Sequence, residues 1–347
     1  MRPRHAARHL LAVPALLLVL AAFAEEPSAR VTTPWMIVPL VEAGPEVGIG
    51  GGAQFLHANI LGGKEFFRLV AEGSSEGQEW YEMEYEDPAI AGSAYAAHAR
   101  ALRRIVPNRR FFGYGGRTDE RDETDHKIKS SSVSLRMDHR LTERVGAWGA
   151  LSYRDVRTGT GALRRVTDTS TRFPDLPGIE GGHVLAASGG AVLDRVVWYR
   201  NTAGYDVYPR SGGRLEGAIE TSGLDTGDFQ KTQFHIAGSA YRPLAREGHV
   251  LCARIAADTV PTRQSAFWDM PSLGGRDTLR GYIDDRFVGP YRLYANLEHR
   301  FPLFEGHVNR IVQGLHGALF VDVGRVWARH EPLTLTHLAA NGGVGLR

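Results

Sequence analysis

Apolar and polar residues alternate with a period of two along most of the chain. Between residues 78 and 87, Tyr81, Met83 and Tyr85 share one face while three glutamates, Glu82, Glu84 and Glu86, share the other. The segments 290–301 and 313–327 alternate in the same way, with Leu297 and Val321 opposite Glu298 and Asp322. Strict alternation of this kind predicts β-strands with one apolar and one polar face.

The pattern predicts fourteen strands. Eleven precede a long glycine-rich connection, at 35–41, 46–57, 64–73, 78–87, 110–117, 128–139, 143–154, 184–197, 211–222, 229–242 and 248–258. Three follow it, at 290–301, 313–327 and in a run that begins near Gly342. Many of these segments are close to the roughly 9–11 residues with which a tilted strand crosses a bilayer.

Short connections, such as 61–63, 141–143 and 243–248, contrast with long ones at 155–182 and 259–289. Short turns at one end and long loops at the other are typical of outer-membrane barrels. A secreted sandwich also alternates, but charges on strand after strand suit a water-filled lumen better. We therefore predict an all-β fold, an antiparallel transmembrane β-barrel, over residues 33–347.

One connection departs from the strand pattern. Residues 88–108 are rich in alanine and arginine, which favour helices. We expect a surface helix here; an interfacial amphipathic helix, or misplaced strand boundaries, are the alternatives.

The N-terminus has the features of a secretory signal peptide. Arg2, Arg4 and Arg8 precede an apolar stretch at 10–23, and Ala22-Phe23-Ala24 forms a small-x-small cleavage site. The alternative, a membrane anchor, needs roughly 20 apolar residues and this stretch is shorter. We predict a signal peptide at 1–24 and export from the cytoplasm.

Composition narrows the function classes. The formal net charge is +2, and without the three signal-peptide arginines 38 basic side chains face 39 acidic ones. Such a balance indicates no nucleic-acid partner. The single cysteine, Cys252, excludes an internal disulfide. No His/Asp constellation surrounds it in sequence, and no metal cluster or phosphate loop is apparent, so we expect no catalytic residues, metal, cofactor or enzyme activity.

The connection before the last three strands contains Gly-Gly-Arg-Asp-Thr-Leu-Arg-Gly-Tyr at 274–282. It is too charged and too rich in glycine for a core strand. Gly274, Gly275 and Gly281 suit tight turns with positive φ. Either this loop is solvated, or it folds back and places Arg280 inside a barrel.

Three motifs in order resemble the BamA/TamA superfamily of outer-membrane assembly and secretion barrels, the bacterial surface antigen type. Residues 274–282 resemble its sixth extracellular loop, Asn-Leu-Glu-His-Arg-Phe-Pro-Leu at 296–303 its next strand, and Phe-Val-Asp-Val-Gly at 320–324 the strand after that. Weaker similarity lies at 45–50 and 208–212. The resemblance covers most of 33–347 and is strongest over 271–327.

The resemblance implies that the sixth loop folds into the lumen and that Arg280 contacts Glu298 and Asp322. The alternation independently places both acids on the polar, inward face. A guanidinium fork matches two carboxylates in geometry. Site residues are then Gly274, Gly275, Arg280, Gly281 and Tyr282 in the loop, the anchoring acids Glu298 and Asp322, and Phe320 and Gly324 of the strand motif. The expected role is structural and conformational rather than catalytic.

Two features depart from the family. Its members usually carry periplasmic POTRA repeats, and here the first predicted strand follows the signal peptide closely. The family barrel has sixteen strands, whereas the sequence stops at 342–347, in what resembles the opening of a fourteenth. We expect that C-terminal strands are missing, because an open sheet edge in lipid is unfavourable; a natural fourteen-strand barrel is the alternative.

The resemblance implies a protein of the Gram-negative outer membrane, in contact with the lipid bilayer, that helps insert or translocate outer-membrane or surface proteins. Its expected partners are nascent outer-membrane proteins or a separate periplasmic protein. The alternative function is that of a stand-alone barrel without POTRA repeats, acting as a passive pore or in lipid handling.

Overall fold

A computed structural model describes residues 35–44, 47–62, 64–200, 206–223, 229–262, 264–304 and 315–346. The predicted signal peptide, 1–24, lies outside the described residues. Among the described residues, no helix has the length and apolar character to cross a membrane.

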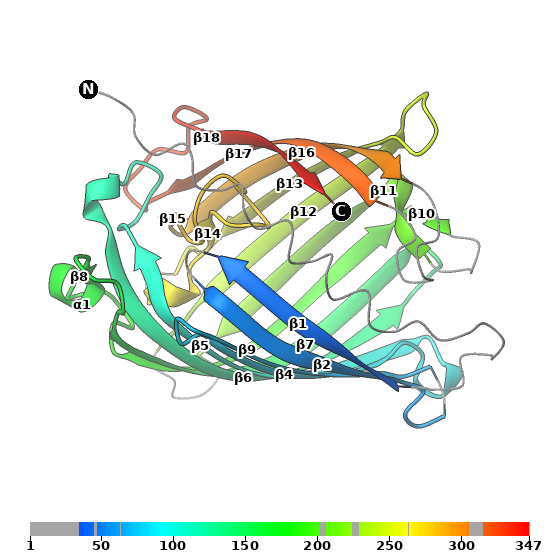
Figure 1. Ribbon diagram of the computed structural model, residues 1–347, viewed down its shortest axis with the longest axis horizontal. Helices are drawn as coiled ribbons and strands as arrows, with labels where there is room; N and C mark the ends of the chain where they lie inside the picture. Colours follow the sequence, from blue (N-terminus) through cyan, green and yellow to red (C-terminus); the bar gives the residue numbers. More distant parts are fainter. Residues whose placement is uncertain are drawn as a thin grey trace.

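The described residues form one sheet of sixteen strands, of which fourteen are hydrogen-bonded antiparallel in chain order (Figure 1). These fourteen are β1 Trp35–Gly44, β2 Gly48–Ala58, β3 Phe66–Ser74, β4 Glu79–Asp87, β5 Tyr95–Phe111, β6 Thr124–Arg140, β7 Val145–Thr160, β9 Gly181–Asp194, β11 Asp206–Ser222, β12 Thr232–Pro243, β13 Val250–Thr259, β16 Tyr291–Phe304, β17 Leu315–Trp327 and β18 Ala339–Leu346. The sheet curls around a central space, with β1 and β18 at its two edges. The predicted antiparallel barrel fold is confirmed.

Smaller elements lie in the connections. β8 (Thr167–Asp168) pairs in parallel with β6, β10 (Val197–Arg200) pairs with β11, and β14 (Ser272–Leu273) pairs with β15 (Phe287–Val288). The single α-helix of the described part, α1, spans Thr169–Arg172, and three short 3-10 turns span Ile90–Gly92, Glu120–Asp122 and Phe267–Asp269.

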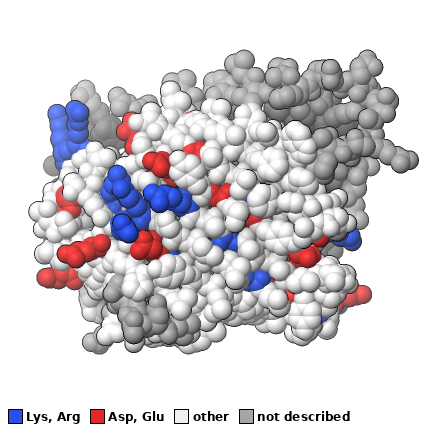
Figure 2. All heavy atoms as spheres, turned by 90° about the horizontal axis from the view of Figure 1, so that it is seen from below, with Lys and Arg blue, Asp and Glu red and all other residues white. Residues whose placement is uncertain are grey.

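The two faces of the sheet differ in polarity, as the alternation predicts. Large apolar side chains are exposed on its outside, among them Met83, Val133, Leu135, Ile236, Leu297, Val321 and Val344. Acidic side chains are buried on its inside, among them Glu82, Asp258, Glu298 and Asp322. Figure 2 shows one face on which most of the surface is uncharged and the largest groups of charged side chains gather toward the end that carries α1. An apolar outside and a charged inside are the arrangement of a membrane barrel.

The predicted helix at 88–108 is wrong, and so is the predicted strand at 110–117. Residues 95–111 form one long strand, β5, paired with both β4 and β6. Along it, Ala97, Ala99 and Ala101 face outward while His98 and Arg100 face inward. Helix propensity is a weak preference, and pairing on both sides outweighs it. The prediction of eleven strands before the long connection is correct because this one strand replaces the misplaced one.

Connections alternate between the two ends of the barrel because every strand pairs antiparallel with the next. One end has turns at 59–65, 88–94, 141–144 and 244–249. The other end has longer connections at 112–123, 161–180 and 260–290. The connection 260–290, which we call loop 6, is the sixth at that end, and Figure 1 shows its β14–β15 ladder inside the curl of the sheet.

Candidate functional site

Loop 6 folds into a small hairpin that is closed by the β14–β15 pairing of Leu273 with Phe287. Gly274 and Gly275 open its tip with φ values of +125° and +82°. A Cβ on Gly274 would lie 2.0 Å from the carbonyl oxygen of Ile283. Only glycine fits such a backbone conformation and such an approach. Gly281 has a different role, because its missing side chain leaves room for Asn341, whose Cβ would lie 2.7 Å from an added Cβ.

The hairpin buries an apolar cluster inside the barrel. Leu273 and Leu279 are fully buried against Phe287, Tyr294 and Val326. Gly324, on β17, leaves the space into which this cluster fits, since a Cβ there would lie 2.9 Å from atoms of both Leu273 and Tyr294. The loop is therefore packed against β16 and β17 by apolar contact as well as by charge.

Arg280 lies at the centre of the polar contacts. Its Nε donates to Oδ2 of Asp322 at 3.0 Å and its Nη2 to Oδ1 at 2.6 Å, a two-pronged ion pair. Its Nη1 donates to Oε2 of Glu298, and its backbone N–H donates to Asp322 at 3.1 Å. The guanidinium Cζ also lies 3.6 Å from the ring centroid of Phe320. The structure thus brings together four of the site residues proposed from sequence.

All three charges of this cluster are shielded from water. The side chain of Asp322 is 0% exposed, that of Glu298 6% and that of Arg280 18%. Burial acts to lower the pKa of Arg280, but the hydrogen bonds to Asp322 and Glu298 raise it above its usual value. The guanidinium stays charged, and the pair is strong because little solvent screens it.

Three polar partners of this cluster were not identified as site residues from the sequence. Asn296 and Asn341 donate to Asp322 at 2.8 and 3.0 Å, and Arg300 donates to Glu298 at 2.7 Å. Asn296 also donates to the carbonyl of Thr278, which ties strand β16 directly to the loop backbone. Every one of these side chains is on the inward face of its strand, and that inward position is the signal that a sequence search could have used.

Phe320 and Tyr282 complete the contacts of the predicted site residues. The ring of Phe320 covers Gly343 of β18, where an added Cβ would lie 2.7 Å from the ring. Tyr282 packs edge-on against Phe287, and its hydroxyl lies 3.4 Å from the carbonyl oxygen of Ala340. Phe320 therefore links β17 to β18, and Tyr282 links loop 6 to β18.

Loop 6 is also bound to the opposite wall of the barrel. Asp285 forms an ion pair with Arg109 of β5. Arg286 donates to the hydroxyl and the carbonyl of Thr118 at 2.7 and 2.8 Å. Asp269 pairs with Arg154 of β7 at 2.8 Å. These contacts make the loop a brace that spans the lumen, with one set of anchors on β16 and β17 and another on β5, β7 and the 112–123 connection.

Lys231 adds a third anchor beside β12. Its amine lies 2.9 Å from Asp269 of loop 6 and 2.7 Å from Glu220 of β11, and its side chain is 3% exposed. Burial acts to lower the pKa of Lys231, but Asp269 and Glu220 together raise it, so the amine remains protonated. Lys231 therefore joins loop 6 to β11 through two carboxylates.

We expect Lys231→Met to destabilise the folded barrel by about 1–3 kcal/mol, because Asp269 loses a buried charged partner but keeps Arg154. The measurement is urea unfolding followed by heat-modifiable mobility on gels. Combining it with Asp269→Asn should cost less than the sum of the two single changes, since both act on one contact. Strictly additive losses would show that the two side chains do not interact.

Over the described ranges, no group of three or more His, Cys, Asp or Glu side chains has the arrangement to hold a metal ion. The carboxylates of Glu298 and Asp322 instead accept hydrogen bonds from arginine and asparagine side chains, so they hold loop 6 to the barrel wall.

Solved structures of similar fold come from two kinds of barrel. CdiB from Escherichia coli aligns with a TM-score of 0.63 at 15% identity, over 92% of this chain and 56% of its own. BamA from Haemophilus ducreyi lacking POTRA domains 1–3 aligns with a TM-score of 0.59 at 16% identity, over 90% and 64%. CdiB from Acinetobacter baumannii gives 0.58 at 13% identity, over 90% and 53%. The chain thus spans between about half and two thirds of these proteins, and at such identities the likeness shows the fold.

No curated protein sequence matches the chain. A family model does: the Omp85 superfamily domain matches residues 59–347, which include the whole of loop 6 and the strands that anchor it. This match confirms the family that the loop and strand motifs indicate, and the chain belongs to the Omp85 superfamily.

Proposed function

We propose that this chain is an exported outer-membrane barrel of Gram-negative bacteria that helps to insert or translocate other outer-membrane or surface proteins. The observation that supports it most is the lumen brace: an Omp85 domain whose loop 6 is held inside the barrel by Arg280, Glu298 and Asp322. The predicted signal peptide at 1–24 would direct export. Its proposed partners are the lipid bilayer and nascent outer-membrane proteins, delivered directly or by a separate periplasmic protein.

The sheet edge supports the same function. In the described part of the chain, β1 is hydrogen-bonded on one side only, to β2. The edge strand also exposes Trp35, Met36 and Ile37. A free strand edge is a template on which another chain can add a strand by main-chain hydrogen bonds. We propose that a client strand pairs here while loop 6 keeps the rest of the barrel in shape, and that no covalent chemistry is involved.

The test is reconstitution of the purified protein in lipid vesicles, followed by addition of a urea-unfolded client barrel. We expect the client to reach its folded, heat-modifiable form faster than in empty vesicles, because the protein offers a pairing edge at the membrane. Vesicles that carry heat-inactivated protein are the control.

Equal client folding rates with and without the protein would contradict the proposed function. If vesicles that carry the active protein do not speed client folding but conduct ions without any client, the protein acts as a passive pore.

A further inference from the structure

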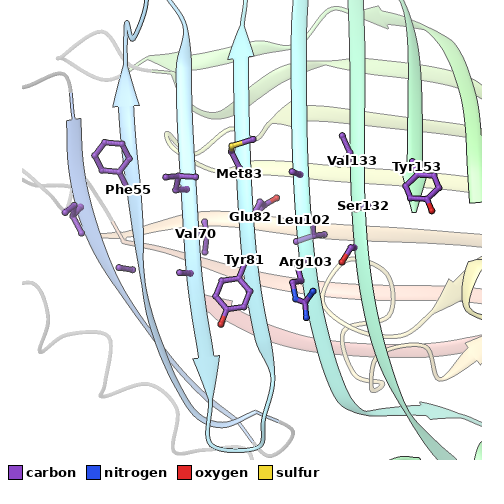
Figure 3. A pocket seen from close by; sticks show the side chains of 16 residues that line it. Phe55, Val70, Tyr81, Glu82, Met83, Leu102, Arg103, Ser132, Val133 and Tyr153 are labelled. Carbon is purple, nitrogen blue, oxygen red and sulfur yellow. The ribbon is translucent and has the colours of Figure 1, made fainter. Parts of the chain in front are cut away.

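A groove runs along the outer, apolar face of strands β1–β7, with a volume of about 760 Å³ (Figure 3). Small side chains, Ala53, Ala71 and Ala101, form its floor. Larger apolar side chains stand around this floor: Ile37, Phe55, Leu69, Tyr81, Met83, Val133 and Tyr153. The strand register sets this shape, because Met83, Ala101, Val133 and Tyr153 are directly opposite one another on four consecutive strands.

Positive charge lies at the end of the groove nearer the long loops. Register partners on β4 to β7 form rows across the sheet. From the row of Met83 toward the long loops, the next row contains Tyr81, Arg103, Ser131 and Asp155, and the one after it contains Glu79, Ile105, Lys129 and Arg157. Arg103 and Lys129 are exposed. Neither forms a hydrogen bond or an ion pair with the part of the chain that the structure describes. Three cations and two carboxylates, those of Glu79 and Asp155, thus occupy the two rows.

Two of these cations are directly opposite each other. Lys129 and Arg157 are register partners on β6 and β7. Arg157 is 78% exposed and reaches Asp155 only at 3.6 Å. Like charges directly across a sheet are destabilising. An anion bound between Lys129 and Arg157, within reach of Arg103, would remove this repulsion.

We propose that the groove binds a phosphorylated membrane lipid, with an acyl chain against the alanine floor and the phosphate among Arg103, Lys129 and Arg157. The apolar floor and walls match the acyl chain, and the three cations, of which only Arg157 has a carboxylate partner among the described residues, match the phosphate. Tyr81 is in the same row as Arg103, and Tyr153 is in the row of Ala101, one step further from the long loops. Aromatic rings beside charged residues are typical of the membrane interface of a barrel. The site is in the leaflet on the side of the long loops. This inference rests on the insertion of the barrel in a bilayer, which is part of the proposed function, but not on any client.

A second outer groove provides a matched comparison. It is lined by Gly238, Ala240, Ala253, Ile255, Leu297 and Val321 on β12 to β17. The row next to it on the loop side contains Ile236, Ala257, Leu293 and Arg325. Arg325 is 1% exposed and donates to the carbonyl of Thr334 at 3.2 Å. This groove has small residues on its floor and no exposed cation in that row. Its one lining cation, Arg254, lies over the ring of Tyr294 on the inward face, so we expect no selectivity for a phosphate there.

The experiment is native mass spectrometry of the purified protein in detergent, titrated with phosphatidic acid, with diacylglycerol and with glycerol 3-phosphate. We expect phosphatidic acid to be retained and the other two, which lack the phosphate or the chains, to be lost. Arg103→Gln and Lys129→Gln should each weaken phosphatidic acid binding about fivefold, and the double variant about 25-fold, since each interfacial cation contributes on the order of 1 kcal/mol. Ala101→Trp, which fills the groove, should abolish binding; Ala253→Trp, in the second groove, should leave it unchanged.

Equal retention of phosphatidic acid and diacylglycerol, or unchanged binding in the Arg103→Gln/Lys129→Gln double variant, would overturn the proposal. Each variant is first checked for heat-modifiable mobility. Should Ala101→Trp not fold, the two exposed glutamine substitutions still decide the outcome. A wild-type chain that never reaches a heat-modifiable form would count against the membrane barrel itself, whereas a folded protein without lipid selectivity counts against this site alone.

Discussion

Replacing Arg280 by alanine should destabilise the folded barrel by up to about 3–5 kcal/mol, the range observed when one partner of a buried ion pair is removed. Asp322 would remain buried without a cation, and Glu298 would keep only Arg300. Water that enters the lumen reduces the loss, because the guanidinium is 18% exposed. The measurement is the urea midpoint for loss of heat-modifiable mobility, together with the rate of chymotrypsin cleavage at Tyr282.

Loop 6 contains its own control. Arg276 is four residues away in the same loop, and its side chain is 94% exposed. We expect Arg276→Ala to unfold at the wild-type urea concentration. Arg280→Lys should recover only part of the loss, because an ammonium is a point charge and cannot reproduce the two-pronged contact with Asp322. Identical urea midpoints for Arg280→Ala and Arg276→Ala would show that the lumen ion pairs do not hold the loop.

The second large effect is expected from Gly274→Ala. The positive φ of this residue alone costs an alanine about 1–3 kcal/mol. In addition, the new Cβ would meet the carbonyl oxygen of Ile283 at 2.0 Å, so the tip of the hairpin must rearrange. We expect loop 6 to lose its contacts with β16 and with the opposite wall of the barrel. Chymotrypsin should then cleave the loop in the otherwise folded protein. Limited proteolysis with mass spectrometry of the fragments measures this.

Gly62→Ala, in the turn at 59–65 at the other end of the barrel, is the control for a strained alanine outside loop 6. Gly62 has a φ of +88°, and no atom lies within 4 Å of where its Cβ would be. This substitution carries the backbone strain without the collision, so it should leave loop 6 resistant to chymotrypsin. If Gly274→Ala resists chymotrypsin as well as Gly62→Ala does, the contact with Ile283 does not determine the conformation of loop 6.

Much of the barrel could be predicted from the sequence. A strand with one lipid-facing and one water-facing side alternates apolar and polar residues with a period of two, which few other structures share. Strand β5 was missed for a physical reason. Its outward positions Ala97, Ala99 and Ala101 are small, so they carry little hydrophobic contrast, and alanine and arginine both favour helices. Pairing with β4 and β6, which determines the conformation, involves residues that no local window contains.

The candidate site was predictable on one side of the lumen only. Alternation placed Glu298 and Asp322 on the inward face, and the family resemblance supplied their pairing with Arg280. Asn341 was missed because β18 begins at Ala339, earlier than its expected start near Gly342. The anchors on the opposite wall depend on which strands face each other across the lumen, and Asp269 and Lys231 belong to no motif in the sequence.

The anchors of loop 6 also constrain the order of folding. Arg286 and Thr118 are 168 residues apart in sequence, and Asp269 and Arg154 are 115 apart. Contacts between such distant residues form late, because the chain between them must first be ordered. The anchors on β17 and the 112–123 connection can be satisfied together only after most of the sheet has curled. Seating of loop 6 is therefore a checkpoint in assembly: a chain with a slipped or missing strand would leave Asp322 or Asp285 without its arginine, and the loop would remain open to proteases.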